Sequence, residues 1–239
     1  MQEVSKVYRE KDGTSAVEAL REITFHVAPG EFLAVTGGSG SGKTTLMNIV
    51  GCLDRPTSGR VIIDGEDPLQ LNDRRLSRLR NEKIGFIFQG FNLLSGRTAL
   101  ENVMLPLTLR GVERKLRRQM AAEALEQVGL GDRLDHRPGQ LSGGQQQRVA
   151  IARVIACKTP IILADEPTGN LDPQAAANIM EILHDLNRQG VTILLITHDP
   201  GVAAQAASRA VMREGRLYDQ TNGNTEHNED NRNEQKRQA

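Results

Sequence analysis

The stretch that most constrains this chain is a glycine-rich run that fits the pattern G-x-x-x-x-G-K-[ST]. An apolar segment of strand length, residues 32–36, precedes it, and residues 46–50 suit the first turns of a helix. Glycines let backbone N–H groups turn inward around phosphate oxygens, and a helix N-terminus favours negative charge. We therefore predict a phosphate-binding loop, made of Gly37, Gly38, Ser39, Gly40, Ser41, Gly42, Lys43, Thr44 and Thr45.

Two side chains of this loop have separate expected roles. Lys43 is expected to reach the β- and γ-phosphates of a nucleoside triphosphate as a point charge. The Thr44 hydroxyl is expected to help hold Mg²⁺. The loop therefore predicts a nucleoside triphosphate and Mg²⁺ as ligands.

The hydrophobic pattern alternates between strand and helix along most of the chain, which predicts a mostly parallel α/β sheet with helices on both faces. Between the two halves of this core, residues 99–140 change to a helical period, with breaks expected at Pro106, Gly111 and Gly129. We expect one domain over residues 1–218 and a polar, disordered tail over 219–239. The strands are expected at 3–8, 23–27, 32–36, 61–63, 84–89, 160–165, 191–197, 210–212 and 217–218, with a loop at 9–15; helices are expected at 71–81, 142–156, 173–188 and after Pro200.

Composition excludes some classes of partner. The 30 basic and 30 acidic residues give a formal net charge of zero, so we expect no nucleic acid partner. The sequence has no apolar run long enough to span a membrane and no signal-peptide core at its start. Only two cysteines are present, too few for a disulfide framework. We expect a soluble, cytoplasmic protein that reaches a membrane only through a partner.

A second chemical feature is a pair of carboxylates after the apolar segment 161–164. The carboxyl ends of strands in an open α/β sheet face the ligand. Asp165 is therefore expected to hold Mg²⁺, and Glu166 to polarise an attacking water.

A third feature is a serine followed by two glycines at the start of a predicted helix. Ser142 suits an N-cap, and Gly143 and Gly144 would leave the first N–H groups of the helix accessible. This predicts a second anion site at a helix N-terminus. The whole stretch is Leu141, Ser142, Gly143, Gly144 and Gln145, followed by Gln146, Gln147 and Arg148.

With these motifs in order, the sequence resembles the nucleotide-binding subunits of ATP-binding-cassette (ABC) transporters over roughly residues 3–218. The resemblance implies a P-loop ABC-type nucleotide-binding domain with an antiparallel edge sheet and an inserted helical subdomain. It also implies an ATPase that converts ATP and water to ADP and phosphate and is coupled to transport. The signature sequence Leu141 to Gln145 would contact ATP bound to a second, identical subunit.

The resemblance also assigns roles to single residues. Tyr8 matches the aromatic residue that stacks on adenine, and Gln89 the glutamine that senses Mg²⁺ and the attacking water. His198 matches the switch histidine that contacts the γ-phosphate. The loop that crosses the dimer interface matches Asn170, Leu171 and Asp172.

Within the family, the segments 57–59, 85–89, 99–107 and 164–172 resemble the macrolide-export and lipoprotein-release branch. This implies a homodimer at the inner face of the cell membrane, attached to an integral-membrane permease with a large extracytoplasmic domain. Gly38 stands where the family usually has proline. Residues 95–97 replace a more apolar segment where the family contacts its permease.

Two other functions remain open at this point. A soluble cassette ATPase of DNA repair would carry a long coiled coil between Lys43 and Asp165, and one of translation would carry two cassettes. A non-hydrolytic nucleotide-binding regulator would lack Lys43, Glu166 or His198, and all three are present. The transported substrate is not encoded in any of these motifs.

Overall fold

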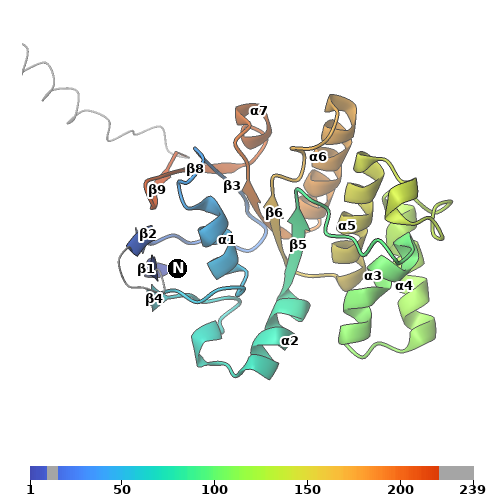
Figure 1. The fold of residues 1–239 in the computed structure, drawn as a ribbon, viewed down its shortest axis with the longest axis horizontal. Coiled ribbons are helices and arrows are strands. Elements are labelled where there is room, and N and C mark those ends of the chain that lie inside the picture. The colour runs from blue at the N-terminus through green and yellow to red at the C-terminus, as the bar shows by residue number, and fades with distance from the viewer. Residues whose placement is uncertain (10–15, 221–239) are drawn as a thin grey trace, which may run out of the picture.

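The computed structural model describes residues 1–9 and 16–220. The predicted loop at 9–15 and the predicted polar tail at 219–239 fall almost entirely outside the described residues. Figure 1 shows a central sheet flanked by helices, with a small sheet at one end and a helical part at the other.

The small sheet has three strands in the order β2-β1-β4, and the large sheet has six in the order β5-β6-β7-β3-β8-β9. The first half of the chain contains β1 (Gln2–Arg9), β2 (Ala16–Ile23), β3 (Phe32–Gly37), α1 (Lys43–Val50), β4 (Ser58–Arg60), α2 (Asp73–Lys83), β5 (Ile84–Phe88), α3 (Ala99–Leu109) and α4 (Arg114–Gln127). The second half contains α5 (Gly143–Cys157), β6 (Ile161–Asp165), α6 (Pro173–Arg188), β7 (Thr192–Ile196), α7 (Pro200–Ala203), β8 (Ser208–Arg213) and β9 (Arg216–Asp219). Short 3₁₀ turns lie at Pro68–Gln70 and Pro138–Gln140.

Five neighbouring strands of the large sheet, β5, β6, β7, β3 and β8, run parallel, and only the edge strand β9 is antiparallel. The carboxyl ends of β3, β5, β6 and β7 therefore meet at one edge of the sheet. The phosphate loop follows β3 and the acidic pair lies at the end of β6. This topology places the two motifs on the ligand-binding side of the sheet.

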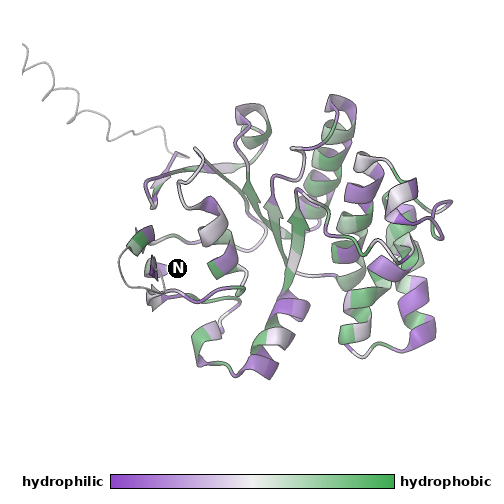
Figure 2. Ribbon diagram, viewed as in Figure 1, coloured by the Kyte–Doolittle hydropathy of each residue, from purple (hydrophilic) through white to green (hydrophobic). Residues whose placement is uncertain are grey.

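Both faces of the large sheet are covered over its central strands, which explains why β3, β5, β6 and β7 are mostly apolar (Figure 2). Alternate residues of each strand face opposite layers. Phe32 and Ala34 of β3 pack into the core cluster that includes α3, α4, α5 and α6. Leu33 and Val35 pack into the second cluster, with α1, α2 and the small sheet.

The helical part confirms the predicted insertion between β5 and β6. Helices α3 and α4 pack on each other and on α5. The Thr98 side chain and Glu101 form a capping box at the start of α3. Glu113 accepts from two N–H groups at the start of α4. The inserted part therefore has its own local start signals.

Three local predictions were wrong. Residues 24–27 are not a strand, because β2 lies earlier and its ladder with β1 ends at the pair Val4 and Ile23. Residues 61–63 are not a strand either: Val61 and Ile63 are buried in the core cluster with α1, Ile62 is exposed, and only Ile63 forms a bridge, to Glu66. Pro106 does not end a helix but lies inside α3, where its carbonyl accepts from the Asn81 side chain.

Candidate nucleotide site

The phosphate loop has a backbone that only glycine accommodates at two positions. Gly37 has a φ of 153°, and a Cβ there would lie 2.4 Å from the Met212 carbonyl oxygen. Gly42 has a φ of 104°, and a Cβ would lie 2.4 Å from the Ala19 carbonyl oxygen. The loop is thus pressed against β8 and β2, and any side chain at either position would displace it.

The start of α1 is open to an anion. Its N-cap residue is Gly42, which has no side chain to satisfy the N–H groups of the first turn. These groups line a groove of about 410 Å³, together with residues of β2 and the turn before β9. The Ser41 hydroxyl is buried and has no hydrogen-bond partner among the described residues. These features fit a phosphate group.

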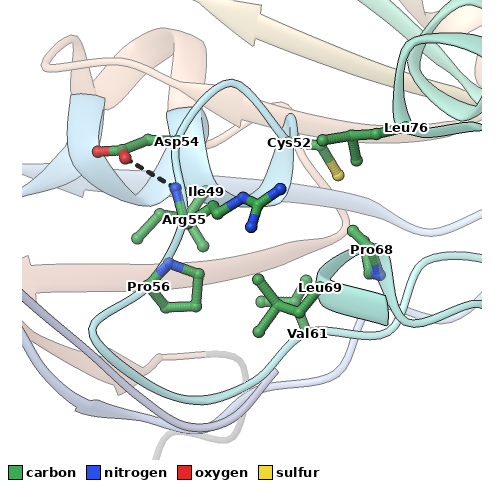
Figure 3. Close-up of a pocket in the computed structure, with 9 residues that line it drawn as sticks. All are labelled: Ile49, Cys52, Asp54, Arg55, Pro56, Val61, Pro68, Leu69 and Leu76. Carbon is green, nitrogen blue, oxygen red and sulfur yellow. Dashed lines mark hydrogen bonds between the residues drawn. The ribbon is translucent and has the colours of Figure 1, made fainter. Parts of the chain in front are cut away.

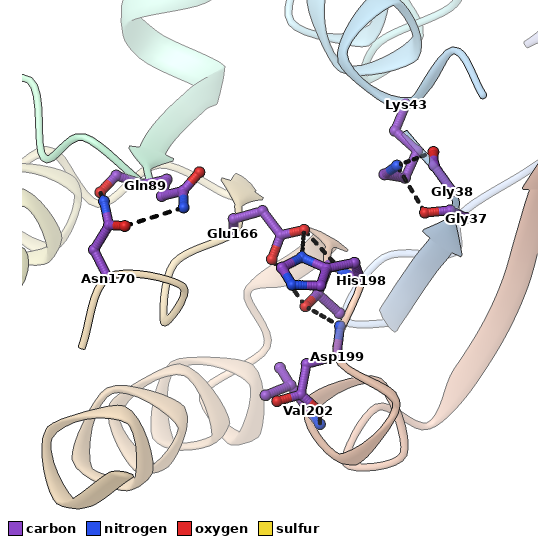
Figure 4. A network of polar contacts seen from close by, with 10 residues as sticks. Gly37, Gly38, Lys43, Gln89, Glu166, Asn170, His198, Asp199 and Val202 are labelled. Carbon is purple, nitrogen blue, oxygen red and sulfur yellow. Dashed lines mark hydrogen bonds and ion pairs between the residues drawn. The ribbon is translucent and has the colours of Figure 1, made fainter. Parts of the chain in front are cut away.

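Lys43 lies over the loop rather than in an ion pair. Its Nζ donates to the carbonyl oxygens of Gly37 and Gly38, at 2.8 Å each (Figure 4). Its positive charge also lowers the pKa of Asp165, which burial and then Glu166 raise above the usual carboxyl range. Lys43 and Asp165 therefore influence each other electrostatically, as the ligands of one phosphate–metal unit must.

Glu166 is held in a fixed orientation. Its Oε1 accepts from the His198 backbone N–H at 2.8 Å and lies 2.7 Å from His198 Nδ1, and its Oε2 accepts from Thr197 Oγ1 at 3.1 Å (Figure 4). Because a carboxylate can only accept, the proton of this His198 tautomer lies on Nδ1. The second ring nitrogen is left for another group.

Gln89 lies beside the same loop. Its side-chain nitrogen donates to Asn170 Oδ1 at 3.2 Å, and Asn170 Nδ2 donates back to the Gln89 carbonyl at 3.1 Å. A Cβ on Gly169 would lie 2.9 Å from Gln89 Nε2, so a glycine is needed for this approach. With its nitrogen on Asn170, the side-chain oxygen of Gln89 is the atom available to a metal or a water.

The signature stretch begins α5. Ser142 and Gln145 form a capping box, with bonds of 2.8 and 3.3 Å. Leu141 is buried in the core cluster. A Cβ on Gly143 would touch Leu171, and one on Gly144 would lie 2.9 Å from the Ala175 side chain. The signature glycines thus pack beside the loop at 170–172 and the start of α6.

The loop at 170–172 ends in a helix cap. Asp172 accepts from the Ala175 N–H at 2.9 Å, and Pro173 is the first residue of α6. Leu171 packs against the main core cluster. The loop is therefore fixed at both ends, by Asn170 on Gln89 and by Asp172 on α6.

Tyr8 lies on β1 near the other end of α1. Its hydroxyl donates to Asp54 Oδ2 at 2.8 Å, and Lys6 Nζ lies 4.8 Å from the ring centroid. Burial and the bond to Asp54 raise its pKa, while a hydrogen bond to Thr45 lowers it. Figure 3 shows Asp54 and Arg55, in the turn after α1, among the residues that line a small pocket together with Cys52 and Leu76. Tyr8 is thus tied to both ends of the phosphate-loop helix.

Two residues at the site were not identified from the sequence. Thr197 orients the Glu166 carboxylate, and the Gln147 side chain, fully buried, donates to the Pro167 carbonyl at 2.7 Å. A polar residue at the end of an apolar strand was the available signal for Thr197. For Gln147, the helical period places it on the buried side of α5, where an amide needs a partner.

The predicted site residues fall into two groups. The phosphate loop, Asp165, Glu166 and His198 gather at the carboxyl ends of β3, β6 and β7, and Gln89 lies at the end of β5. The signature stretch lies with α5, on the other side of the molecule from α1 (Figure 1). One chain therefore does not bring its signature stretch to its own phosphate loop.

The fold and the site together define a P-loop nucleotide-binding domain with an inserted helical subdomain. Residues 20–169 match the protein family described as "ABC transporter". The chain belongs to the ABC transporter family, as an ATP-binding subunit that hydrolyses ATP to ADP and phosphate. The predicted family and fold class are confirmed; the roles of single site residues remain predictions.

Similar proteins agree with this assignment. An ABC transporter ATP-binding protein of Thermotoga maritima is 53% identical, covering 86% of this chain and 88% of that protein. The ABC transporter ATP-binding protein YvrO of Bacillus subtilis is 51% identical over 94% of this chain and 97% of its own. The macrolide export ATP-binding/permease protein MacB of Brucella melitensis is 48% identical over 92% of this chain, which spans only 34% of MacB.

Solved structures give the same fold. The ATP-binding cassette MJ0796, in a dimeric post-hydrolysis state with ADP and phosphate, matches with a TM-score of 0.82 and 43% identity. The match covers 90% of this chain and 94% of that one. The structural match therefore extends over both the α/β core and the inserted helical part.

Proposed function

We propose that two copies of this chain close around ATP and drive an integral-membrane permease of the macrolide-export or lipoprotein-release type from the cytoplasmic face of the membrane. The observation that carries the dimer is the separation of the signature stretch from the phosphate loop. A second copy would supply the missing half of each site. The dimeric state of the similar cassette MJ0796 supports this arrangement.

In the proposed site, the N–H groups of α1 and Lys43 bind the β- and γ-phosphates. Glu166, oriented by Thr197 and His198, accepts a proton from the attacking water. The outward ring nitrogen of His198 contacts the γ-phosphate. Tyr8 stacks on the base, and Gly143 and Gly144 of the second copy close the site.

The residues present fit Mg²⁺. The ion is usually held by one or two carboxylates with oxygens of the phosphates and water. Asp165 is a partly buried carboxylate at the end of β6, beside the charge of Lys43. Together with the Thr44 hydroxyl and the Gln89 side-chain oxygen it would hold the ion. When bound, Mg²⁺ supplies positive charge that offsets the charge of the phosphates.

The permease is proposed from relatives. MacB carries its ATP-binding part and its permease in one chain, and this chain matches about a third of it. Among the described residues, no helix is long and apolar enough to cross a membrane. A permease like the one that MacB carries would provide the path, and the residues described here would provide the ATP-driven movement.

The decisive variant is Glu166→Gln, which keeps the shape of the side chain and removes the proton acceptor. Steady-state hydrolysis should fall about 10²- to 10⁴-fold, the usual contribution of general base catalysis. ATP should still bind, so the protein should be trapped as a dimer. Light scattering after size-exclusion chromatography, with saturating MgATP and with MgADP, measures this.

Glu181→Gln is the matched control, because Glu181 is exposed on α6. It should hydrolyse ATP like the unaltered protein. If Glu166→Gln binds ATP but stays monomeric, the proposed dimer is excluded.

A further inference from the structure

The buried amide of Gln147 joins the signature helix to the catalytic loop. Gln147 is 0% exposed, and its Nε2 donates to the Pro167 carbonyl at 2.7 Å. Pro167 directly follows Glu166. The Oε1 atom of Gln147 has no partner among the described residues, so packing alone does not explain a polar side chain at position 147.

The loop that receives this bond is a tight turn centred on Glu166. Glu166 has a φ of 45°, a left-handed conformation that costs energy outside glycine. Its N–H donates to the Ile196 carbonyl at 2.9 Å, and the Gly169 N–H donates to the Glu166 carbonyl at 3.1 Å. Ile196, at the end of β7, and the residues that follow it, Thr197 and His198, thus hold the backbone and the carboxylate of Glu166. Gln147 fixes the next carbonyl from the side of α5.

The same helix has a second polar contact, partly buried, further along. Arg153 donates to the carbonyls of Phe91 and Asn92, at 2.7 Å each. Both acceptors have left-handed backbones, and they follow Gln89 by two and three residues. Helix α5 therefore holds backbone beside both Gln89 and Glu166, while its first turn carries the signature stretch.

A helix moves as a rigid body over such distances. Gln147 lies five residues after Ser142, about one and a half turns. The capping box fixes the first turn of α5, so a small shift of Ser142 displaces Gln147 with it. The Pro167 carbonyl would follow, because the bond is short and buried.

We propose that Gln147 is a positioning residue that couples the start of α5 to Glu166 of the same chain. On the proposed function, on which this inference rests, the start of α5 contacts ATP held by the other copy. Closure of one ATP site then sets the geometry of Glu166 in the other site. Gln147 acts through Glu166 and does not touch the nucleotide.

The first test is Gln147→Met, which keeps the length of the side chain and removes the donor. The kcat of ATP hydrolysis should fall about tenfold or more, since small misplacements of a catalytic group carry costs of this size. The KM for ATP should stay within about twofold, because phosphate and base contacts are intact. Gln147→Met in the Glu166→Gln background should still form the ATP-trapped dimer.

The second test is a pH profile. Gln147→Glu has an O–H donor for the Pro167 carbonyl only while its carboxyl is protonated. Its kcat, relative to the unaltered protein, should rise as the pH is lowered from about 9 to about 6, because burial favours the neutral acid. Gln147→Met should show no such rise. A merely structural role would not produce this difference.

Asn187→Leu is the control for lost packing and hydrogen bonding. The partly buried Asn187 also donates from a helix to backbone, to Gly30 and Val191, but far from the site. It should lower the melting temperature and leave kcat unchanged. An unaltered kcat in Gln147→Met overturns the coupling. So does a lower kcat if Gln147→Met in the Glu166→Gln background also loses the ATP-trapped dimer, because the substitution then disturbs dimer formation itself. If the single variant Glu166→Gln forms no dimer with ATP, the proposed function is overturned, and the coupling through Gln147 is not what has failed.

Discussion

At the scale of single residues, Tyr8 lies at an exposed position of the site. Its side chain is 42% exposed, and its orientation depends on the bond to Asp54 and on Lys6 over the ring. Lys6 itself pairs with Asp54 at 2.8 Å. One face of the ring is therefore occupied by a cation, and the other is available for the adenine base.

Tyr8→Ala should raise the KM for ATP roughly five- to 150-fold, because stacking of a base on an aromatic ring contributes about 1–3 kcal/mol. The kcat should change little, since the base is bound equally before and during the reaction. Steady-state kinetics over a range of ATP concentrations separates the two. The control is Tyr218→Ala, which removes the other exposed tyrosine, on β9. An unchanged KM in Tyr8→Ala would remove Tyr8 from the base site.

The residues that could be predicted from the sequence are those whose backbone surroundings are local. The glycines of the phosphate loop, the acidic pair and the Ser142 cap lie within short, contiguous patterns. Thr197 and Gln147 act on Glu166 and Pro167 across 31 and 20 positions. Such partners depend on how distant segments pack, which no local pattern specifies.

At the scale of elements, side-chain caps mark where α5 and α6 begin, whereas the extent of a strand depends on the neighbouring strand with which it pairs. Ser142 begins α5 through a side-chain cap, as predicted, and Asp172 caps α6 in the same way, which was not predicted. The segments 24–27 and 61–63 have strand-like composition but no neighbouring strand at the right place. Residue composition alone could not show this, because the edge of a ladder depends on the partner.

Helix α3 offers a test of how much its capping box stabilises the inserted part. Thr98→Ala removes the acceptor of the Glu101 N–H and should lower the free energy of unfolding by about 0.5–2 kcal/mol. Differential scanning calorimetry should show a melting temperature lower by a few degrees. The control is Thr108→Ala, whose exposed hydroxyl bonds only back to Met104 on the same helix. Equal losses in both variants would show that the cap contributes nothing special.

At the scale of the whole molecule, the proposed site is divided between two sides of one subunit. The phosphate loop, with Asp165, Glu166 and His198, occupies the strand ends, and the signature stretch begins a helix of the inserted side. In the proposed two-fold symmetric dimer, the phosphate loop of each copy would meet the signature stretch of its partner. Binding of ATP between them would link nucleotide state to the distance between two attached permease subunits.

This division predicts that two inactive variants restore each other. Lys43→Ala removes the phosphate contact, and Gly143→Asp adds a negative charge where the γ-phosphate would lie; a Cβ on Gly143 meets ordinary contacts at 3.5 Å, so the helix should form. Random pairing of the two gives half mixed dimers, each with one intact site, so ATPase activity should return to at most about a quarter of the full value. It should stay below that value where the coupling through Gln147 requires the second site to close. The control mixes either variant with a chain carrying both substitutions, which leaves no intact site. Activity of the mixture no higher than that of the separate variants would mean that each chain completes its own site.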